Sequence, residues 1–182
     1  MRITVVIPVR DDAEMLRTAL ASLGTQQRKP DEIVVVDNAS TDDSAQIARD
    51  AGARVVDEPR VGIPSAASAG YDAATGDIIA RIDADSICGT DWLARIERAF
   101  ETDPELDLLT GDARFYGSSD LVHRLGERFY IGGFYWAVTP YLGPPPVFGS
   151  NFAMRASTWR ELSGDVHRTR GIHDDLDLSL HI

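Results

Sequence analysis

The sequence predicts an α/β fold in which a mostly parallel sheet carries helices on both of its faces. Three observations lead to this prediction. Short runs rich in β-branched residues alternate with helix-like segments along the first half of the chain. The connections between them are short, as repeated strand–helix–strand units require. The runs are apolar at successive positions, which is typical of strands buried on both faces inside a parallel sheet.

The first 86 residues account for four strands and three helices. The predicted strands cover residues 3–7, 33–36, 54–56 and 77–82. The predicted helices run from Asp11 or Asp12 to Gly24, from Ser40 or Thr41 to Gly52, and from Pro64 to Ala74. Side chains that favour N-caps, or a proline in the first turn, begin each helix, and leucine or alanine recurs inside them at helical spacing.

The second half of the chain is less regular. A helix capped by Thr90, a strand over residues 106–116 with a break at Gly111, and a helix within residues 121–138 are expected first. An extended linker over residues 143–146, a strand over 147–154, a helix capped by Ser157 and a helix beginning at Asp174 follow. Because the chain stops at Ile182 inside an amphipathic segment, we expect the natural protein to continue beyond it.

Charge and composition exclude several classes of protein. With 18 Lys and Arg against 29 Asp and Glu, the net charge is −11, which argues against a nucleic-acid partner. The single cysteine, Cys88, excludes an internal disulfide and a multi-cysteine zinc site. No apolar run approaches the roughly 18 residues of a membrane span, and Pro8 and Arg10 interrupt any signal peptide. A cytoplasmic location is therefore the expectation.

Polar residues follow three of the four predicted strands at their carboxyl ends. They are Arg10, Asp11 and Asp12, then Asp37, Asn38 and Ser40, then Asp83 and Asp85. In open α/β sheets, ligands bind beyond the carboxyl ends of the strands, near a switch in strand order. The sequence therefore predicts a binding site at this edge.

The triplet Asp83-Ala84-Asp85 is the most informative of these segments. Residues two apart on an extended chain point the same way, so both carboxylates face one space. They repel each other unless a hard cation such as Mg²⁺ or Mn²⁺ lies nearby, and such an ion commonly binds ligand phosphates as well. The alternative is a pair of solvated loop aspartates or a helix cap.

Asp37 directly follows three valines and has two interpretations. Its carboxylate can accept hydrogen bonds from a ribose or a base, or it can form an Asx turn before the next helix. The chain contains no dinucleotide-binding glycine fingerprint, no phosphate-binding loop of the Walker type and no nucleophile elbow. These absences disfavour a dehydrogenase, a P-loop enzyme and an α/β-hydrolase.

Near the end of the chain, Asp174 and Asp175 precede a leucine-patterned turn. Either one can act as a general base toward an acceptor hydroxyl, or both can serve the helix terminus as cap and dipole partner. His167 and His173 are candidate metal ligands, although an ordinary structural role is the simpler interpretation for a lone histidine.

Five segments in this order resemble family 2 glycosyltransferases, which have the GT-A fold, over essentially all 182 residues. The segments are Val6-Ile-Pro-Val-Arg-Asp-Asp12, Val36-Asp-Asn-Ala-Ser-Thr-Asp42, Gly76-Asp-Ile-Ile-Ala-Arg-Ile-Asp-Ala-Asp85, Gly149-Ser-Asn-Phe-Ala-Met-Arg155 and His173-Asp-Asp-Leu-Asp-Leu178. The resemblance implies one domain over residues 1–182. Residues 1–86 would form its nucleotide-binding half and residues 87–182 its acceptor-side half.

The resemblance also implies roles for individual residues. Those assigned to the nucleotide are Pro8, Arg10, Asp12, Asp37 and Asp83. Asp85, with Asp83 beside it, would hold a divalent cation, Mn²⁺ or Mg²⁺. Asp175 matches the expected catalytic base, and Asp174 stands where the family has glutamate. Gly149, Ser150 and Asn151 would lie beside the donor sugar and the acceptor.

The chain departs from the family pattern at three places. Arg10-Asp11 replaces Tyr-Asn, Ala66-Ala67-Ser68 replaces Ala-Arg-Asn, and Ser86 replaces the last aspartate of the acidic run. The family's arginine helps to hold the nucleotide. Arg81 is the candidate replacement, and its alternation with Asp83 allows both side chains to face one side of the strand.

The resulting hypothesis is a metal-dependent, inverting transfer of a sugar from a nucleoside-diphosphate sugar to a hydroxyl of a glycan, lipid-linked or small-molecule acceptor. One alternative is a non-catalytic domain that binds nucleotide sugars. Another is a sugar nucleotidyltransferase, although Val9-Arg-Asp-Asp12 lacks the glycine-rich, arginine-containing loop of such enzymes. Attachment to the cytoplasmic face of a membrane through residues beyond Ile182 stays open.

Overall fold

The computed structural model describes residues 1–111, 146–169 and 171–182. Six strands of this part of the chain form one sheet, in the order β3-β2-β1-β4-β6-β5. Their bounds are β1 Ile3–Val9, β2 Glu32–Asp37, β3 Arg54–Asp57, β4 Ile78–Ile82, β5 Leu108–Thr110 and β6 Asn151–Arg155. The predicted first-half strands are confirmed, each to within a few residues.

The sheet is parallel over the four strands of the first half and antiparallel at β6. Strand β1 lies between β2 and β4, with Val6 opposite both Val34 and Arg81. Strand β6 runs antiparallel to both β4 and β5. The order reverses at β1, because the chain adds β2 and β3 on one side and then crosses to add β4 on the other. The predicted mostly parallel α/β sheet is confirmed.

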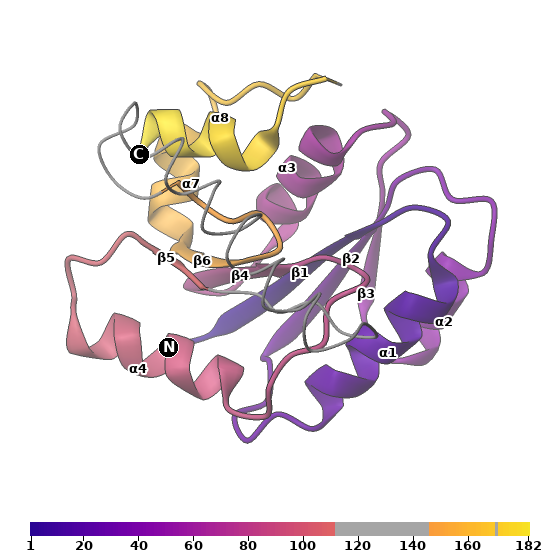
Figure 1. The fold of residues 1–182 in the computed structure, drawn as a ribbon, viewed down its shortest axis with the longest axis horizontal. Helices are drawn as coiled ribbons and strands as arrows, with labels where there is room; N and C mark the ends of the chain where they lie inside the picture. Colours follow the sequence, from indigo (N-terminus) through magenta and orange to yellow (C-terminus); the bar gives the residue numbers. More distant parts are fainter. Residues whose placement is uncertain (112–145, 170) are drawn as a thin grey trace, which may run out of the picture.

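Helices cover both faces of this sheet (Figure 1). One face carries α1 Ala13–Gly24, α2 Ser44–Asp50 and α4 Trp92–Thr102, which share a core with β1 through side chains such as Leu16, Ile47 and Ile96. The other face carries α3 Ile63–Ala73, α7 Ala156–Leu162 and α8 Asp174–His181, which bury Tyr71, Trp159 and Leu178. The layers match the prediction from sequence.

Helix α3 packs against the sheet closely enough to require a glycine. A Cβ added at Gly70 would lie 2.3 Å from Val6 Cγ1 and 2.9 Å from Val36 Cγ2. Both valines are fully buried, so neither side chain has room to move aside. Pro64 lies in the first turn of this helix, as predicted.

Glu32, at the start of β2, joins several elements at the opposite edge of the sheet from the strand ends discussed below. Its Oε2 accepts hydrogen bonds from Thr4 Oγ1 (2.8 Å), Thr75 N (2.9 Å) and Thr75 Oγ1 (2.9 Å). Its Oε1 accepts two from Arg54, at 3.0 and 2.7 Å. One carboxylate thus ties β1, β3 and the α3–β4 connection to β2.

Three predicted helix caps are wrong. Helix α2 begins at Ser44 with Asp43 at the N-cap, because Ser40 and Thr41 contact the neighbouring β1–α1 loop instead. Helix α4 begins at Trp92, two residues after Thr90. Helix α7 begins at Ala156, directly after β6, so Ser157 lies inside it. None of these three helices has a side-chain hydrogen bond from its N-cap residue.

The irregular second half was harder to predict. The strand expected over residues 147–154 forms only as β6, because residues 148–151 make a turn closed by a hydrogen bond from Asn151 N to Phe148 O. Strand β5 covers three residues of the predicted 106–116. The rest of that strand beyond 111, the helix within 121–138 and most of the linker over 143–146 lie outside the described residues.

No helix within the described ranges has both the length and the apolar composition to cross a membrane.

Candidate active site at the carboxyl edge of the sheet

The reversal in strand order at β1 places a cavity beyond the carboxyl ends of β1 and β4, as open α/β sheets predict. Its volume is about 1260 Å³. The residues lining it that sequence reasoning singled out are Asp12, Asp85, Gly149, Ser150, Asn151 and Asp175. They come from segments as far apart as the first loop and α8, so the fold brings both predicted halves of the site together.

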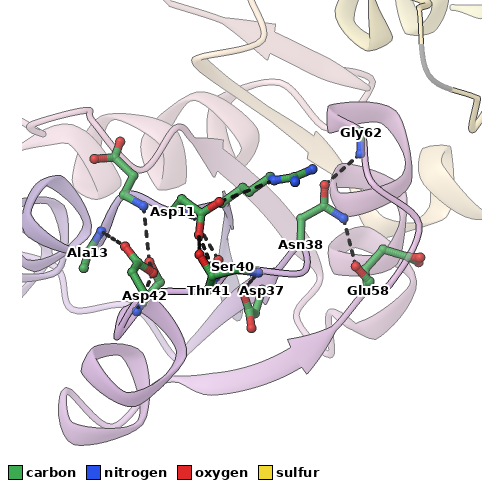
Figure 2. A network of polar contacts seen from close by, with 12 residues as sticks. Asp11, Ala13, Asp37, Asn38, Ser40, Thr41, Asp42, Glu58 and Gly62 are labelled. Atoms are coloured by element: carbon green, nitrogen blue, oxygen red, sulfur yellow. Dashed lines mark hydrogen bonds and ion pairs between the residues drawn. The ribbon is translucent and has the colours of Figure 1, made fainter.

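The loops that follow β1 and β2 are bound to each other (Figure 2). Asp11 Oδ1 accepts hydrogen bonds from Thr41 N at 2.6 Å and Thr41 Oγ1 at 3.0 Å, which lower the pKa of Asp11. Asp11 N donates to Ser40 Oγ at 3.1 Å. Asp11 and Ala39 have φ of 52° and 57°, a left-handed conformation that non-glycine residues rarely adopt. These contacts hold both loops in that conformation.

Asp42 serves the N-termini of two helices at once, as Figure 2 shows. Its Oδ2 accepts from Ala13 N at 3.0 Å, at the start of α1. Its Oδ1 accepts from Ser44 N (3.0 Å) and Ser44 Oγ (2.6 Å), at the start of α2. Asp12 occupies the N-cap position of α1, as expected, but its side chain makes no capping hydrogen bond. Asp42 accepts the hydrogen bond from Ala13 N instead, and Asp12 lines the cavity.

Asp37 and Asn38 shape the end of β2. Asp37 Oδ1 accepts from Ser40 N at 3.0 Å, so the Asx turn that was one of its two interpretations is present. The buried Asn38 amide donates to Glu58 O and Arg60 O and accepts from Gly62 N, all within 2.9 Å. This clamp fixes the loop after β3 beside Asp37. That Asp37 binds a base stays a prediction.

Asp12 and Asp85 are close enough for their charges to interact. Burial raises the pKa of Asp12, and the negative charges of Asp85 and Asp42 raise it further. Two mutually repelling carboxylates on one cavity wall suit a hard divalent cation, which prefers oxygen ligands. The described residues hold no cluster of three or more His, Cys, Asp or Glu side chains able to bind a metal.

Asp83, which the sequence was expected to place in one space with Asp85, is not among the residues that line the cavity. Its Oδ1 accepts from Arg81 Nη2 at 3.2 Å, and its Oδ2 accepts from Ser150 Oγ. Arg81 itself is buried beneath this edge and does not line the cavity. Two other residues were predicted to bind nucleotide. Arg10 is exposed, and its Nε lies 3.6 Å from Asp11 Oδ2. Pro8 is part of β1, opposite Val36.

Asp175 is held at the start of α8 by backbone groups. Its Oδ2 accepts from Gly149 N at 3.2 Å, and its Oδ1 accepts from Leu176 N at 2.9 Å. A Cβ at Gly149 would lie 3.1 Å from Oδ2, so glycine lets the two segments meet. Asp174 does not cap α8, whose N-cap is His173, because the Asp174 carboxylate contacts Arg81. The capping interpretation of Asp174 is therefore wrong.

Sequence reasoning missed two aromatic residues near the site. Trp92 lines the cavity, and its Nε1 donates to Asn151 Oδ1 at 2.9 Å. Tyr71 contacts Arg81 from the buried face of α3. Tyr71 stands out as the only aromatic residue in an alanine-rich helix, whereas Trp92 fits the apolar pattern of its helix and gives no such signal. His167 contacts Asp177 of α8, consistent with a structural role.

A comparison with protein families identifies this chain. The family described as glycosyl transferase family 2 matches residues 4–162. The chain belongs to this family. An uncharacterized glycosyltransferase of Mycobacterium tuberculosis is 43% identical over 112 residues, covering 62% of this chain and 49% of the relative. A PGL/p-HBAD biosynthesis glycosyltransferase of Mycobacterium bovis is 30% identical over 159 residues, covering 76% of this chain and 62% of the relative.

Solved structures agree on the fold. A mannosyltransferase from Pyrobaculum calidifontis, in complex with GDP-Man and Mn²⁺, superimposes with a TM-score of 0.74 at 23% identity, covering 98% of this chain and 50% of its own. Glucosyl-3-phosphoglycerate synthase from M. tuberculosis, in complex with Mn²⁺, UDP and phosphoglyceric acid, superimposes with a TM-score of 0.63 at 25% identity. The superposition covers 86% of this chain and 56% of the synthase chain. The GT-A fold is confirmed. The chain spans about half the length of several of these relatives.

Proposed function

We propose that the protein transfers a sugar from a nucleoside-diphosphate sugar to an acceptor hydroxyl. The observation that carries the proposal is the cavity itself. Carboxylates from the end of β1 (Asp12), the end of β4 (Asp85) and the start of α8 (Asp175) line one space at the switch point of the sheet. Membership of glycosyl transferase family 2 supports the same reaction.

We assign the donor to the half formed by residues 1–86. Pro8, Arg10, Asp12, Asp37 and Asp83 surround the carboxyl ends of β1, β2 and β4, where a nucleotide would extend across the sheet edge. The clamp made by Asn38 keeps the loop after β3 in place beside the base. Residues 87–182 would present the acceptor, with Gly149, Ser150 and Asn151 between the two substrates.

A divalent cation, Mg²⁺ or Mn²⁺, fits the carboxylates of Asp85 and Asp12. The charge of Asp85 raises the pKa of Asp12, and a bound cation would relieve that repulsion. Bound there, the ion would neutralise negative charge on the departing diphosphate. We do not assign Asp83 to the cation, because it does not line the cavity and both of its oxygens already accept hydrogen bonds, from Arg81 and Ser150.

Asp175 is the proposed general base. Its carboxylate accepts the proton of the acceptor hydroxyl, whose oxygen forms a bond to the anomeric carbon while the bond to the diphosphate oxygen breaks on the opposite side. Attack from the face opposite the leaving group inverts the configuration. The hydrogen bonds from Gly149 N and Leu176 N fix the orientation of Asp175, so positioning is the main contribution of the protein.

The first experiment is thermal stability against UDP, GDP, dTDP and CDP, each with and without Mn²⁺. A nucleotide at 100 times its dissociation constant stabilises the folded state by roughly 2.7 kcal/mol, which shifts the melting temperature by several degrees. We expect one nucleotide to act, only with Mn²⁺, and Asp85→Asn to abolish the shift. Asp50→Asn, on the exposed end of α2, is the matched control. Absence of any shift would contradict a donor site in this chain.

The second experiment separates transfer from binding. Asp175→Asn should keep nucleotide binding and lose transfer by at least about 100-fold, the lower range for a positioned general base. Undiminished transfer would refute the base assignment. Binding without turnover in the unmodified chain would instead favour a non-catalytic binding domain. Pyrophosphate release from a nucleoside triphosphate and a sugar 1-phosphate would favour a nucleotidyltransferase.

A further inference from the structure

Arg81 is a buried cation in the middle of a strand. It occupies the fourth position of β4, opposite Val6 of β1 and Phe152 of β6, and its side chain is 3% exposed. It lies on the face that α3 and α8 cover. A charge in such a place is strongly disfavoured unless carboxylates and hydrogen bonds compensate it.

The compensation comes from three separate elements. Arg81 Nη1 donates to Tyr71 Oη of α3 at 3.1 Å and to Asp174 Oδ2 of α8. Arg81 Nη2 donates to Asp83 Oδ1, just beyond β4, at 3.2 Å. Arg81 Nε is buried and has no hydrogen-bond partner among the residues that the structure describes. The guanidinium thus forms the centre of a network that joins two helices to the end of β4.

Each of the two carboxylates in this network is linked to a residue that lines the cavity. Asp174 is directly followed by Asp175, the proposed base, so an ion pair at Asp174 fixes the first turn of α8 against the sheet. The other oxygen of Asp83, Oδ2, accepts a hydrogen bond from Ser150 Oγ. Helix α8 is 8 residues long, and a helix of that length depends on tertiary contacts for its stability and its place.

We propose that Arg81 is a positioning residue that aligns the proposed base with the donor site by clamping Asp174 and Asp83. This inference rests on the proposed function. Arg81 and Asp174 are both absent from the cavity lining, whereas Asp175 and Ser150 belong to it. Arg81 therefore acts through the residues it holds, and its burial favours this role over direct contact with a nucleotide.

Kinetics of Arg81→Met, Arg81→Lys and Asp174→Asn in the full chain test the proposal. The assay is sugar transfer or donor hydrolysis with the nucleotide sugar found by the stability panel, alongside the dissociation constant of the matching nucleoside diphosphate. We expect Arg81→Met to lower kcat by about 100-fold, the effect of misplacing a catalytic group by about 1 Å, with nucleotide affinity within threefold. Arg81→Lys, which keeps the charge, should recover part of kcat.

Arg54→Met is the matched control. Arg54 also pairs with a carboxylate from a strand of the same sheet, but at the opposite edge and 44% exposed. The kcat of Arg54→Met should equal that of the unmodified chain. Weaker nucleotide binding with retained kcat in Arg81→Met would make Arg81 a donor-binding residue and overturn the proposal. A loss of kcat no larger than the loss of folded protein, measured by circular dichroism, would overturn it as well.

A double-mutant cycle of unfolding separates this proposal from the proposed function. The stabilities of Arg81→Lys, Asp174→Asn and the double variant should be non-additive, because the two side chains are in contact. Additive effects would refute the clamp even if transfer is confirmed. Transfer that persists in Asp175→Asn would refute the base assignment, and the cycle would still report whether Arg81 holds α8.

Discussion

Replacing Glu32 by glutamine is expected to remove a pH-dependent part of the stability of this fold. Burial disfavours the charge of Glu32, but hydrogen bonds from Thr75, Arg54 and Thr4 outweigh it and lower the pKa from 4.5 to about 2. A carboxylate whose pKa is lower in the folded state stabilises that state above the unfolded pKa. Its contribution is lost as the pH falls from 4.5 towards 2.

The magnitude follows from the two pKa values. The difference between 4.5 and about 2 corresponds to about 3 kcal/mol when the contribution is complete, at about 1.36 kcal/mol per pKa unit. Because the carboxylate takes up its proton near pH 4.5 in the unfolded state and only near pH 2 in the folded state, about 2 kcal/mol of this stabilisation is lost between pH 7 and pH 3. The side chain is 14% exposed, so solvent screening removes little of it.

Urea unfolding at a series of pH values from 7 to 3 measures this contribution. The difference in free energy of unfolding between the unmodified chain and Glu32→Gln should be constant above pH 6 and shrink by about 2 kcal/mol at pH 3. Glu101→Gln, on an exposed position of α4, corrects for the loss of one negative charge. A difference that stays constant down to pH 3, or grows, would show that the Glu32 contacts do not hold its charged form.

Three further predictions concern other parts of the fold. Gly70→Ala should lower the free energy of unfolding in urea by about 1–3 kcal/mol, because the clash with Val6 outweighs the roughly 1 kcal/mol that alanine adds to a helix. The control Gly24→Ala, with no atom within 4 Å of the new Cβ, should be neutral or stabilising, and equal effects of the two substitutions would contradict the close approach of α3. Asp42→Ala removes the acceptor of the first N–H groups of α1 and α2 and should lower the melting temperature by the equivalent of about 1–2 kcal/mol; an unchanged melting temperature would exclude the shared cap. Burial raises the pKa of the Cys88 thiol to about 11, so its reaction with a disulfide reagent at pH 8 should be about 100-fold slower than that of a free cysteine in the unfolded chain, and a comparable rate would refute the burial.

The strands of the first half could be predicted because their signal is local. A buried parallel strand such as β2 is apolar along its whole length, and the residue after it must lie at the carboxyl edge of the sheet. Asp12 and Asp85 could therefore be assigned to one edge of the sheet from the strand pattern, whereas Asp175 was assigned to the site only through the resemblance of its segment to the family. Helix α8 was likewise marked by its alternating leucines and by the acidic residues of its first turn.

The caps could not be predicted because their partners lie far away in the sequence. Asp12 occupies the N-cap position of α1 as expected, but the Ala13 N–H donates to Asp42, 29 residues further along the chain, and no rule based on neighbouring residues can anticipate that acceptor. Arg81 poses the same difficulty, since its contact with Asp174 spans 93 residues. The sequence shows a charge inside an otherwise apolar strand, which predicts a compensating partner but does not identify the residue.

The place of β6 between β4 and β5 has a consequence for the synthesis of this protein. Strand β4 emerges from the ribosome about 70 residues before its antiparallel neighbour β6, so its outer edge stays unpaired while the whole interval is translated. A nascent chain paused there would expose an open strand edge with Ile79 and Ile82 beside it. Delay in reaching residue 155 would therefore favour contact with chaperones or with other nascent chains over the folded state.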